Sequence, residues 1–248
     1  MIAWAVIAFV EGLIVGSFIT VVAHRVPRGE SIVRPRSRCP ACGTTVAAYD
    51  NVPVVSWALL RGRARCCGAR ISPLYPLTEL TVGALWAAAV IVHWGDAAEI
   101  AIDLVFVAVL AAVTVTDLEQ RLIPNKILIV GAVLCLGIAV PTDPSGVPER
   151  LIAAVAAGGL FFCVALAYPK GMGLGDVKLA ATMGLFLGRA VAPAILIALL
   201  AGSLVGGALL IRHGARARKM AIPFGPFLAL GGVVGMLAGS RLIDLYLA

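Results

Sequence analysis

Charged residues are scarce in this chain of 248 residues, at 13% of the total, and aromatic residues make up only 6%. A typical soluble domain is about 25% charged and roughly 45–50% apolar. Here 61% of the residues are hydrophobic and the mean hydropathy is +1.01. This composition excludes a disordered chain, a coiled coil and a small disulfide-stapled secreted domain. It predicts an all-α polytopic membrane protein.

Long apolar runs indicate the membrane-spanning helices, because a crossing needs about 20 consecutive apolar residues. One run is shorter than the others, and counting it gives eight transmembrane helices. The predicted spans are Ile2–Ala23, Leu77–Trp94, Ala98–Thr116, Ile127–Pro141, Leu151–Ala167, the short Val177–Gly188, Ala190–Ile211 and Ile222–Leu247. Glycines four residues apart allow close helix packing in lipid. They stand at Gly12/Gly16, Gly184/Gly188, Gly202/Gly206 and Gly231/Gly235/Gly239.

The basic residues predict the orientation, because cytoplasmic loops carry an excess of Lys and Arg. If the chain starts outside and crosses eight times, 17 of its 20 basic residues face the cytoplasm, and only Arg150, Arg189 and Arg241 do not. Seven spans would place the basic run Arg212–Lys219 opposite the Arg-rich first loop. We therefore predict a multi-pass protein of a cytoplasmic membrane with both termini outside. The N-terminus has no basic residue before its apolar run, so we expect no cleaved signal peptide.

The one loop of domain length, His24–Pro76, holds four of the six cysteines. Cys39-Pro-Ala-Cys42 is a CxxC motif followed by glycine. Its expected partner is a second CxxC about 20 residues later, as in four-thiolate zinc sites. The sequence there is Ala64-Arg65-Cys66-Cys67-Gly68, with alanine at the first ligand position. We predict a structural zinc site made by Cys39, Cys42 and Cys67, with Cys66 as the fourth ligand.

Two alternatives to this zinc site remain open. Cys66 is adjacent to Cys67, and consecutive side chains point apart, so three thiolates completed by water or His24 form the first alternative. In the second, the loop holds no metal and its thiols are incidental. A metal suits a loop of this size, because so short a segment buries little core. Cys135 and Cys163 lie in predicted spans, where we expect small apolar packing residues.

The nine arginines of the same loop suggest contact with membrane lipid, since basic clusters at a cytoplasmic membrane face bind anionic headgroups. Solvated charge that only sets the topology is the simpler interpretation. A nucleic-acid partner is not expected, because few aromatic residues are interleaved with the arginines. They are Tyr49, Trp57 and Tyr75.

Carboxylates near the membrane are the candidate catalytic groups, because ionisable residues in spans are costly. Asp117 ends the third predicted span, and Asp176 lies in a Gly-rich turn before the sixth, 59 positions later. Both fall at the cytoplasmic boundary. Two carboxyl groups held close do not both ionise, so one acts as general base on water while the other, protonated, polarises a carbonyl. This is aspartic peptide hydrolysis. The alternatives are an N-cap role for Asp176 and a solvated turn at Asp117.

Four other acids lie near or within spans. We expect solvation to explain Asp96 and Asp103, which stand in or near a short outer loop. Glu11 lies in the middle of the first span and Glu79 begins the second. Contact with a substrate or cofactor and a hydrogen bond between helices are both open for these two.

Taken together, the motifs resemble those of the bacterial prepilin peptidases, membrane aspartic proteases with a GxGD motif. The resemblance covers nearly the whole chain. It rests on Gly12–Phe18, His24–Pro27, Cys39–Cys42, Tyr49–Trp57, Ile71–Leu80, Thr116-Asp117 with Ile123–Asn125, Gly173–Leu179 and Pro223–Phe227. The resemblance implies catalysis by Asp117 and Asp176.

This resemblance also implies a substrate and a second activity. Family members cleave the basic leader from type IV prepilins, or from the pseudopilins of type II secretion, at the cytoplasmic face of the bacterial inner membrane. Many also N-methylate the new N-terminal residue with S-adenosylmethionine, an activity associated with the four-cysteine region. Here Ala64 departs from the pattern. Predicted domains are a first helix (1–23), a zinc domain (24–76) and a peptidase bundle (77–248).

Two other functions remain possible from the sequence. One is a leader peptidase without methyltransferase activity. The other is a proton-coupled transporter that uses Glu11, Asp117 and Asp176 as a relay.

Overall fold

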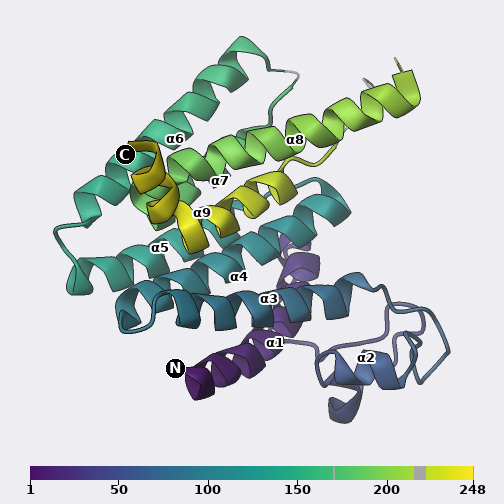
Figure 1. The fold of residues 1–248 in the computed structure, drawn as a ribbon. Coiled ribbons are helices and arrows are strands. Elements are labelled where there is room, and N and C mark those ends of the chain that lie inside the picture. The colour runs from purple at the N-terminus through teal and green to yellow at the C-terminus, as the bar shows by residue number, and fades with distance from the viewer. Residues whose placement is uncertain (170, 215–221, 248) are drawn as a thin grey trace. The chain divides into compact units, whose positions relative to one another are not determined.

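A computed structural model describes residues 1–169, 171–214 and 222–247 of the chain. Those residues contain helices, turns and two isolated β-bridges but no β-strand, which confirms the all-α prediction. The helices form two compact units, residues 1–96 and 97–248 (Figure 1). Four of the basic residues used to predict orientation lie outside the described residues: Lys170, Arg216, Arg218 and Lys219.

Unit 1 is built on two long helices, α1 (Ile2–Arg25) and α3 (Leu74–Val92), which pack along each other. A Cβ added to Gly12 would lie 2.7 Å from the Cα of Gly83, and one on Gly16 would lie 2.7 Å from the Cα of Glu79. The predicted close approach at these glycines is therefore confirmed.

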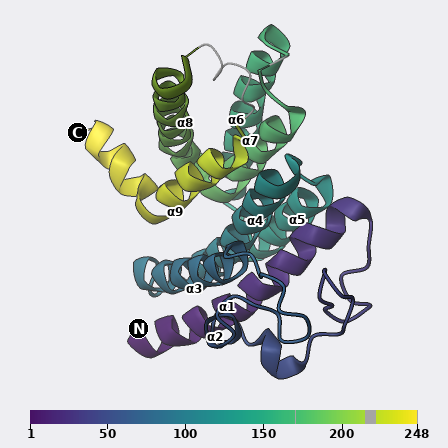
Figure 2. The same cartoon turned by 90° about the vertical axis from the view of Figure 1, so that its right-hand side faces the viewer.

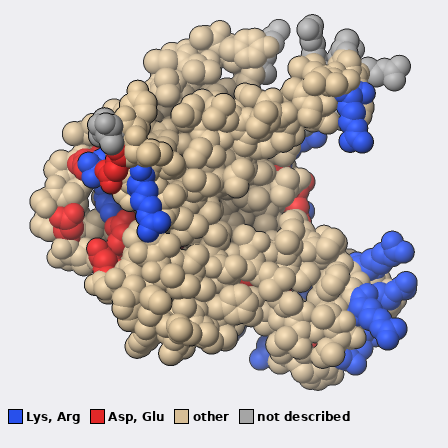
Figure 3. Space-filling model, viewed as in Figure 1, with Lys and Arg blue, Asp and Glu red and all other residues tan. Residues whose placement is uncertain are grey.

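The insertion between α1 and α3 holds the short helix α2 (Val55–Leu59) and two 3₁₀ segments, η1 (Val26–Arg28) and η2 (Ala48–Asn51). Lys and Arg side chains gather over this insertion on the face shown in Figure 3.

The described residues of unit 2 form six helices and a 3₁₀ segment. They are α4 (Ala97–Gln120), α5 (Asn125–Thr142), α6 (Val147–Ala167), α7 (Leu174–Leu187), η3 (Gly188–Ala190), α8 (Val191–His213) and α9 (Gly225–Leu247). α7 contacts α5, α6 and α9, while α4 packs on α5 and α9 (Figures 1 and 2). The rings of Phe106 and Phe186 stack with centroids 4.8 Å apart. Leu179, Met183 and Leu228 are fully buried beside them. This core brings α4, α7 and α9 together.

Small residues also bring α8 and α9 together. A Cβ on Gly235 would lie 2.8 Å from the Cβ of Ala194, and one on Gly239 would lie 2.5 Å from the Cβ of Ala190. Gly206, by contrast, has open space around it, so the small-residue interpretation is wrong at that position.

The helices match the eight predicted spans in order, and seven segments are long and apolar enough to cross a membrane among the described residues. The count of seven segments instead of eight spans results from α7. Its 14 residues extend about 21 Å, which is less than the thickness of the hydrocarbon core, roughly 30 Å. Together with α8 it forms one apolar segment, Leu174–His213.

The two ends of unit 2 carry different groups. At one end, Arg150 pairs with Glu99 at 2.6 Å, and the N–H of Arg189 donates to Glu149 at 3.1 Å. Glu99 and Asp117 are 18 residues apart on α4, which corresponds to about 27 Å. Arg150 and Arg189, two of the basic residues predicted to face outside, therefore lie at the end of unit 2 away from Asp117.

Two expectations about single residues need correction. Asp103 is only 3% exposed, so the prediction of a solvated carboxylate is wrong; the fourth helix starts at Ala97 and carries it into the bundle. Cys135 is fully buried, as expected of a packing residue, whereas Cys163 is exposed on α6.

Candidate active site and metal centre

Asp117 is a buried residue of α4 that binds the start of α9. Its Oδ2 accepts a hydrogen bond from the N–H of Gly225 at 2.8 Å, and the residue is 6% exposed. The first N–H groups of a helix have no partner within that helix, so Asp117 satisfies one of them. The predicted span ended at Thr116, but α4 continues to Gln120. The alternative of a solvated turn at Asp117 is therefore wrong.

Glycine is required at the start of α9. A Cβ added to Gly225 would lie 2.7 Å from Oδ2 of Asp117 and 3.2 Å from its Cβ. Pro226 follows in the first helical turn, where a missing N–H has no cost. The sequence Phe224-Gly225-Pro226 thus lets the helix end approach the carboxylate directly.

Asp176 lies in the first turn of α7. Its Oδ2 accepts the N–H of Gly173, the residue before the helix, at 3.3 Å. It is therefore the third helical residue and not the N-cap, although it does stabilise the helix start. A carboxylate here also lies at the positive end of the helix dipole. The charge of Asp117 acts on Asp176, so the fold brings the predicted pair into one site.

The loop between α4 and α5 packs against the start of α7. A Cβ on Gly175 would lie 3.1 Å from the Cβ of Ile123, so the glycine-rich turn fits closely against that side chain. Lys178 donates to the side-chain oxygen of Asn125 at 3.0 Å. The motifs Ile123–Asn125 and Gly173–Lys178, separated by about 50 residues, thus meet beside the aspartates.

Glu11 and Glu79, the other two candidate acids, do not form a carboxylate pair with each other. Glu11 is exposed on α1. Glu79 is 7% exposed, accepts the N–H of Val54 at 2.7 Å and is hydrogen-bonded to the side chain of Ser17. The predicted hydrogen bond between helices is therefore present at Glu79, because Ser17 belongs to α1 and Glu79 to α3.

Val54, the partner of Glu79, has an unusual backbone. Its φ of 61° and ψ of −50° are those of a strained γ-turn, closed by a 2.5 Å hydrogen bond from the N–H of Val55 to the carbonyl of Pro53. A β-branched residue with positive φ is uncommon and persists only where its surroundings hold it. Glu79 provides that support.

The cysteines lie on two hairpins of the same construction, each with an antiparallel bridge, Arg38↔Thr45 in one and Arg63↔Arg70 in the other. In both, a glycine N–H donates at 2.8 Å to the carbonyl four residues earlier: Gly43 to Cys39, and Gly68 to Ala64. Both glycines have φ near +70°, which glycine adopts without strain. Ala64 therefore occupies the position that corresponds to Cys39.

Cys66 supplies the sulfur that Ala64 lacks. The four sulfur atoms of Cys39, Cys42, Cys66 and Cys67 all lie within 4.8 Å of one another. Cys66 Sγ is 3.3 Å from Cys42 Sγ and 3.9 Å from Cys67 Sγ, and Cys39 Sγ is 3.7 Å from Cys67 Sγ. Sulfurs bound tetrahedrally to zinc at 2.3 Å are about 3.8 Å apart. The four residues fit a zinc ion.

The thiols of this cluster differ in acidity. Hydrogen bonding with the side chain and then the backbone of Thr44 lowers the pKa of Cys42 to about 6. Hydrogen bonding to Cys42, with partial burial, raises the pKa of Cys66 to about 12. One thiol of the cluster is thus readily ionised while its neighbour keeps its proton.

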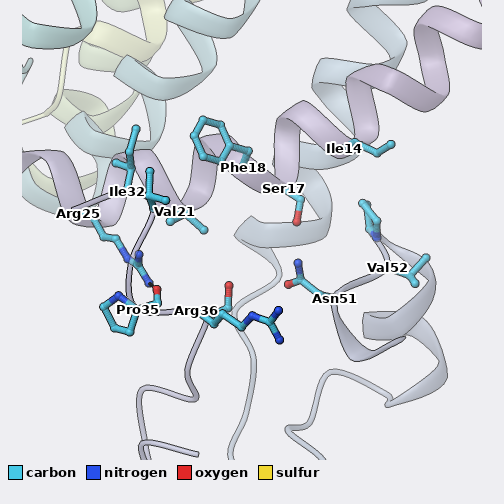
Figure 4. A pocket seen from close by; sticks show the side chains of 13 residues that line it. Ile14, Ser17, Phe18, Val21, Arg25, Ile32, Pro35, Arg36, Asn51 and Val52 are labelled. Carbon is cyan, nitrogen blue, oxygen red and sulfur yellow. Dashed lines mark hydrogen bonds between the residues drawn. The ribbon is translucent and has the colours of Figure 1, made fainter. Parts of the chain in front are cut away.

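A cavity of about 480 Å³ lies in unit 1, beside the second half of α1. Thirteen residues line it, from α1, the segment that follows it and the segment before α2 (Figure 4). Arg36, Ser17 and Asn51 point toward one another at one side, while Phe18 and Ile32 lie together at another.

Comparisons with known proteins agree with this arrangement. A family model described as "Bacterial Peptidase A24 N-terminal domain" matches residues 10–93, and one described as "Type IV leader peptidase family" matches residues 104–211. A prepilin leader peptidase/N-methyltransferase of Bacillus subtilis (strain 168) is 37% identical over 97% of both chains. The chain belongs to the type IV leader peptidase family. The predicted resemblance is thereby confirmed.

Two further family members are also prepilin leader peptidase/N-methyltransferases. The Myxococcus xanthus (strain DK1622) protein is 38% identical over 85% of this chain and 64% of its own length. The Stutzerimonas stutzeri protein is 32% identical over 99% and 94%, respectively. No solved structure gives a significant match.

Sequence reasoning missed two structural features, one in each unit. Gly225 was noticed only as part of a family motif, although a glycine between Phe224 and Pro226 signals close backbone approach. The γ-turn at Val54 had no signal, because nothing in the residue type indicates positive φ.

Proposed function

We propose that this member of the family cleaves the leader peptide from prepilin or pseudopilin precursors and N-methylates the new N-terminus. The observation that carries the peptidase is Asp117, buried in α4 and held by the first N–H of α9, with Asp176 of α7 near enough to feel its charge. Both residues fall within the part of the chain that matches the leader peptidase family. The names of the relatives support both activities.

The dyad hydrolyses the peptide bond by sharing one proton. The charged carboxylate takes a proton from water as the water attacks the scissile carbonyl, and the protonated partner donates to the carbonyl oxygen. Collapse of the tetrahedral intermediate then passes a proton to the leaving amine. The N-termini of α7 and α9, each beside one carboxylate, favour the negative charge that the pair retains.

The direct test uses the purified full-length protein, a prepilin and S-adenosylmethionine, with product masses as the measurement. A product that lacks the leader supports the peptidase. An added mass of about 14 Da supports methyl transfer, in which a methyl group replaces an amine proton. Cleavage without added mass would leave a leader peptidase alone, and an uncut precursor would contradict the whole proposal.

Gly225→Ala should slow cleavage roughly tenfold to a hundredfold, because its Cβ would lie 2.7 Å from Oδ2 of Asp117 and displace the carboxylate. The measurement is the initial rate of leader removal at equal amounts of folded protein. Gly137→Ala is the control, since a Cβ there has open space. Equal rates for both variants would contradict the proposed role of the Asp117–Gly225 contact.

Zinc is the proposed structural metal, held by Cys39, Cys42, Cys66 and Cys67. It would stabilise the insertion, whose two hairpins contribute a single buried cysteine side chain, Cys39. S-adenosylmethionine is the proposed methyl donor, and it supplies an electrophilic methyl group bound to a sulfonium.

The proposed orientation places the aspartates and the Arg-rich insertion at the cytoplasmic face of the inner membrane, with both termini outside. The two ends of unit 2 support this orientation, because Arg150 and Arg189, proposed to face outside, lie at the end away from Asp117. The insertion's arginines are proposed to contact anionic membrane lipid.

A further inference from the structure

We infer that the cavity of unit 1 is the S-adenosylmethionine site, and that Arg36 binds the carboxylate of the ligand. This inference rests on the proposed methyl transfer. Three observations carry it: the place of the cavity in the chain, the free guanidinium at its polar side, and a buried carboxylate behind its wall.

The place of the cavity separates it from the peptidase. Its lining residues all lie between Ile14 and Pro53, within the match to the N-terminal domain and outside the leader peptidase match at 104–211. A second activity located outside the aspartate site needs its own binding site. The volume of about 480 Å³ falls in the usual range of roughly 300–1,000 Å³ for sites of small ligands and cofactors.

Arg36 is the cation available to a ligand. Arg25 also lines the cavity, but its guanidinium already donates to the carbonyls of Ser31 and Pro35, each at 2.9 Å, and so holds the cavity wall. Arg36 makes no hydrogen bond or ion pair with any described residue. Figure 4 shows it directed toward Ser17 and Asn51. A guanidinium forms a two-pronged contact with a carboxylate, which matches the amino-acid end of S-adenosylmethionine.

The rest of the cavity suits the remaining groups of the ligand. Phe18, Val21 and Ile32 form an apolar side that can enclose a flat adenine ring, and Asn51 offers both a donor and an acceptor for its edge.

A buried carboxyl group outside the lining supports one wall of the cavity. Ser17, which lines the cavity, is hydrogen-bonded to the carboxyl group of Glu79. The same carboxyl group accepts the N–H of Val54 and supports the strained turn that follows the lining residues Val52 and Pro53. Glu79 is thus a positioning residue of this site, because it holds both Ser17 and the turn behind the cavity wall.

The test compares two ligands and three proteins by isothermal titration calorimetry on the full-length chain in detergent. The ligands are S-adenosylmethionine and its decarboxylated analogue. The proteins are the unchanged chain, Arg36→Gln and, as matched control, Arg34→Gln, which alters an exposed arginine outside the cavity lining. Equal zinc content and equal melting temperature show that the variants are folded.

We expect the unchanged chain and Arg34→Gln to bind S-adenosylmethionine about tenfold or more tightly than the decarboxylated analogue. Arg36→Gln should bind the two ligands with equal affinity, because it lacks the ion pair between Arg36 and the ligand carboxylate that distinguishes them. Photo-crosslinking with S-adenosylmethionine should also label a peptide within residues 14–53. Retained discrimination in Arg36→Gln, or a label elsewhere in the chain, would overturn the inference while leaving methyl transfer intact.

Two other outcomes overturn the inference in different ways. An unchanged chain that binds no S-adenosylmethionine and methylates no product refutes the proposed methyl transfer itself. Native mass spectrometry that finds an anionic phospholipid bound to the unchanged chain and lost in Arg36→Gln, with unaltered binding of S-adenosylmethionine, assigns the cavity to lipid.

Discussion

We expect Asp117→Asn to lower the rate of leader cleavage by roughly a hundredfold to ten-thousandfold, the usual range for loss of a general acid or base. The amide still accepts a hydrogen bond from the N–H of Gly225, so the start of α9 is maintained. It cannot take a proton from water or return one. Asp176→Asn should have an equally large effect, because either carboxyl group alone lacks the shared proton. The measurement is the rate of leader removal by mass spectrometry.

Glu119→Gln is the matched control, since it makes the same chemical change at an exposed position two residues along α4. Its rate should stay within about twofold of the unchanged chain, as expected of surface substitutions. The aspartate variants should retain binding of the precursor in a pull-down. If either aspartate variant cleaves at a near-normal rate, the assignment of the catalytic pair is wrong.

Cys39→Ser should remove zinc from the protein and abolish methyl transfer. The proposed zinc would join two hairpins in which Cys39 is the one buried cysteine, so we expect the fold of the insertion to depend on the metal. The same insertion lines the cavity, which should be lost with it; the lining residues from the insertion are Ile32, Val33, Pro35, Arg36, Ser37, Asn51, Val52 and Pro53. Elemental analysis should fall from about one zinc per chain to none. Cleavage should persist, because hydrolysis is assigned to Asp117 and Asp176.

The role of Cys66 as the fourth zinc ligand can be tested by moving the cysteine from position 66 to position 64. Cys66→Ser should weaken or abolish zinc binding, since Cys66 Sγ lies 3.3 Å from Cys42 Sγ within the cluster. Ala64→Cys in the same chain should restore it, because Ala64 stands where Cys39 stands in the matching hairpin. Full zinc content in Cys66→Ser alone would instead support three thiolates with water or His24. A folded Cys39→Ser variant that lost zinc and cleavage together would contradict the separation of the two sites.

Much of this protein could be predicted from local features of the sequence. Apolar runs located the eight long helices of the described residues to within a few residues, because a membrane-spanning helix needs about 20 mostly apolar residues in a row. They gave no sign of the short helix α2. Four cysteines in one short loop predicted the cysteine cluster, since a loop of that length brings its own thiols together. Glycine spacing predicted the contact of α1 with α3 at Gly12 and Gly16.

The tertiary structure decided how distant residues meet, and with it the chemistry. Asp117 and Gly225 are 108 positions apart, and only the packing of α4 on α9 makes the carboxylate the partner of a helix N-terminus. The same packing buried Asp103, which looked solvated near a loop. Glu79 could have faced lipid, substrate or protein until α1 placed Ser17 beside it. The composition of a segment indicates whether it lies in lipid or in water. A catalytic site depends on contacts between distant segments, and no local pattern encodes these.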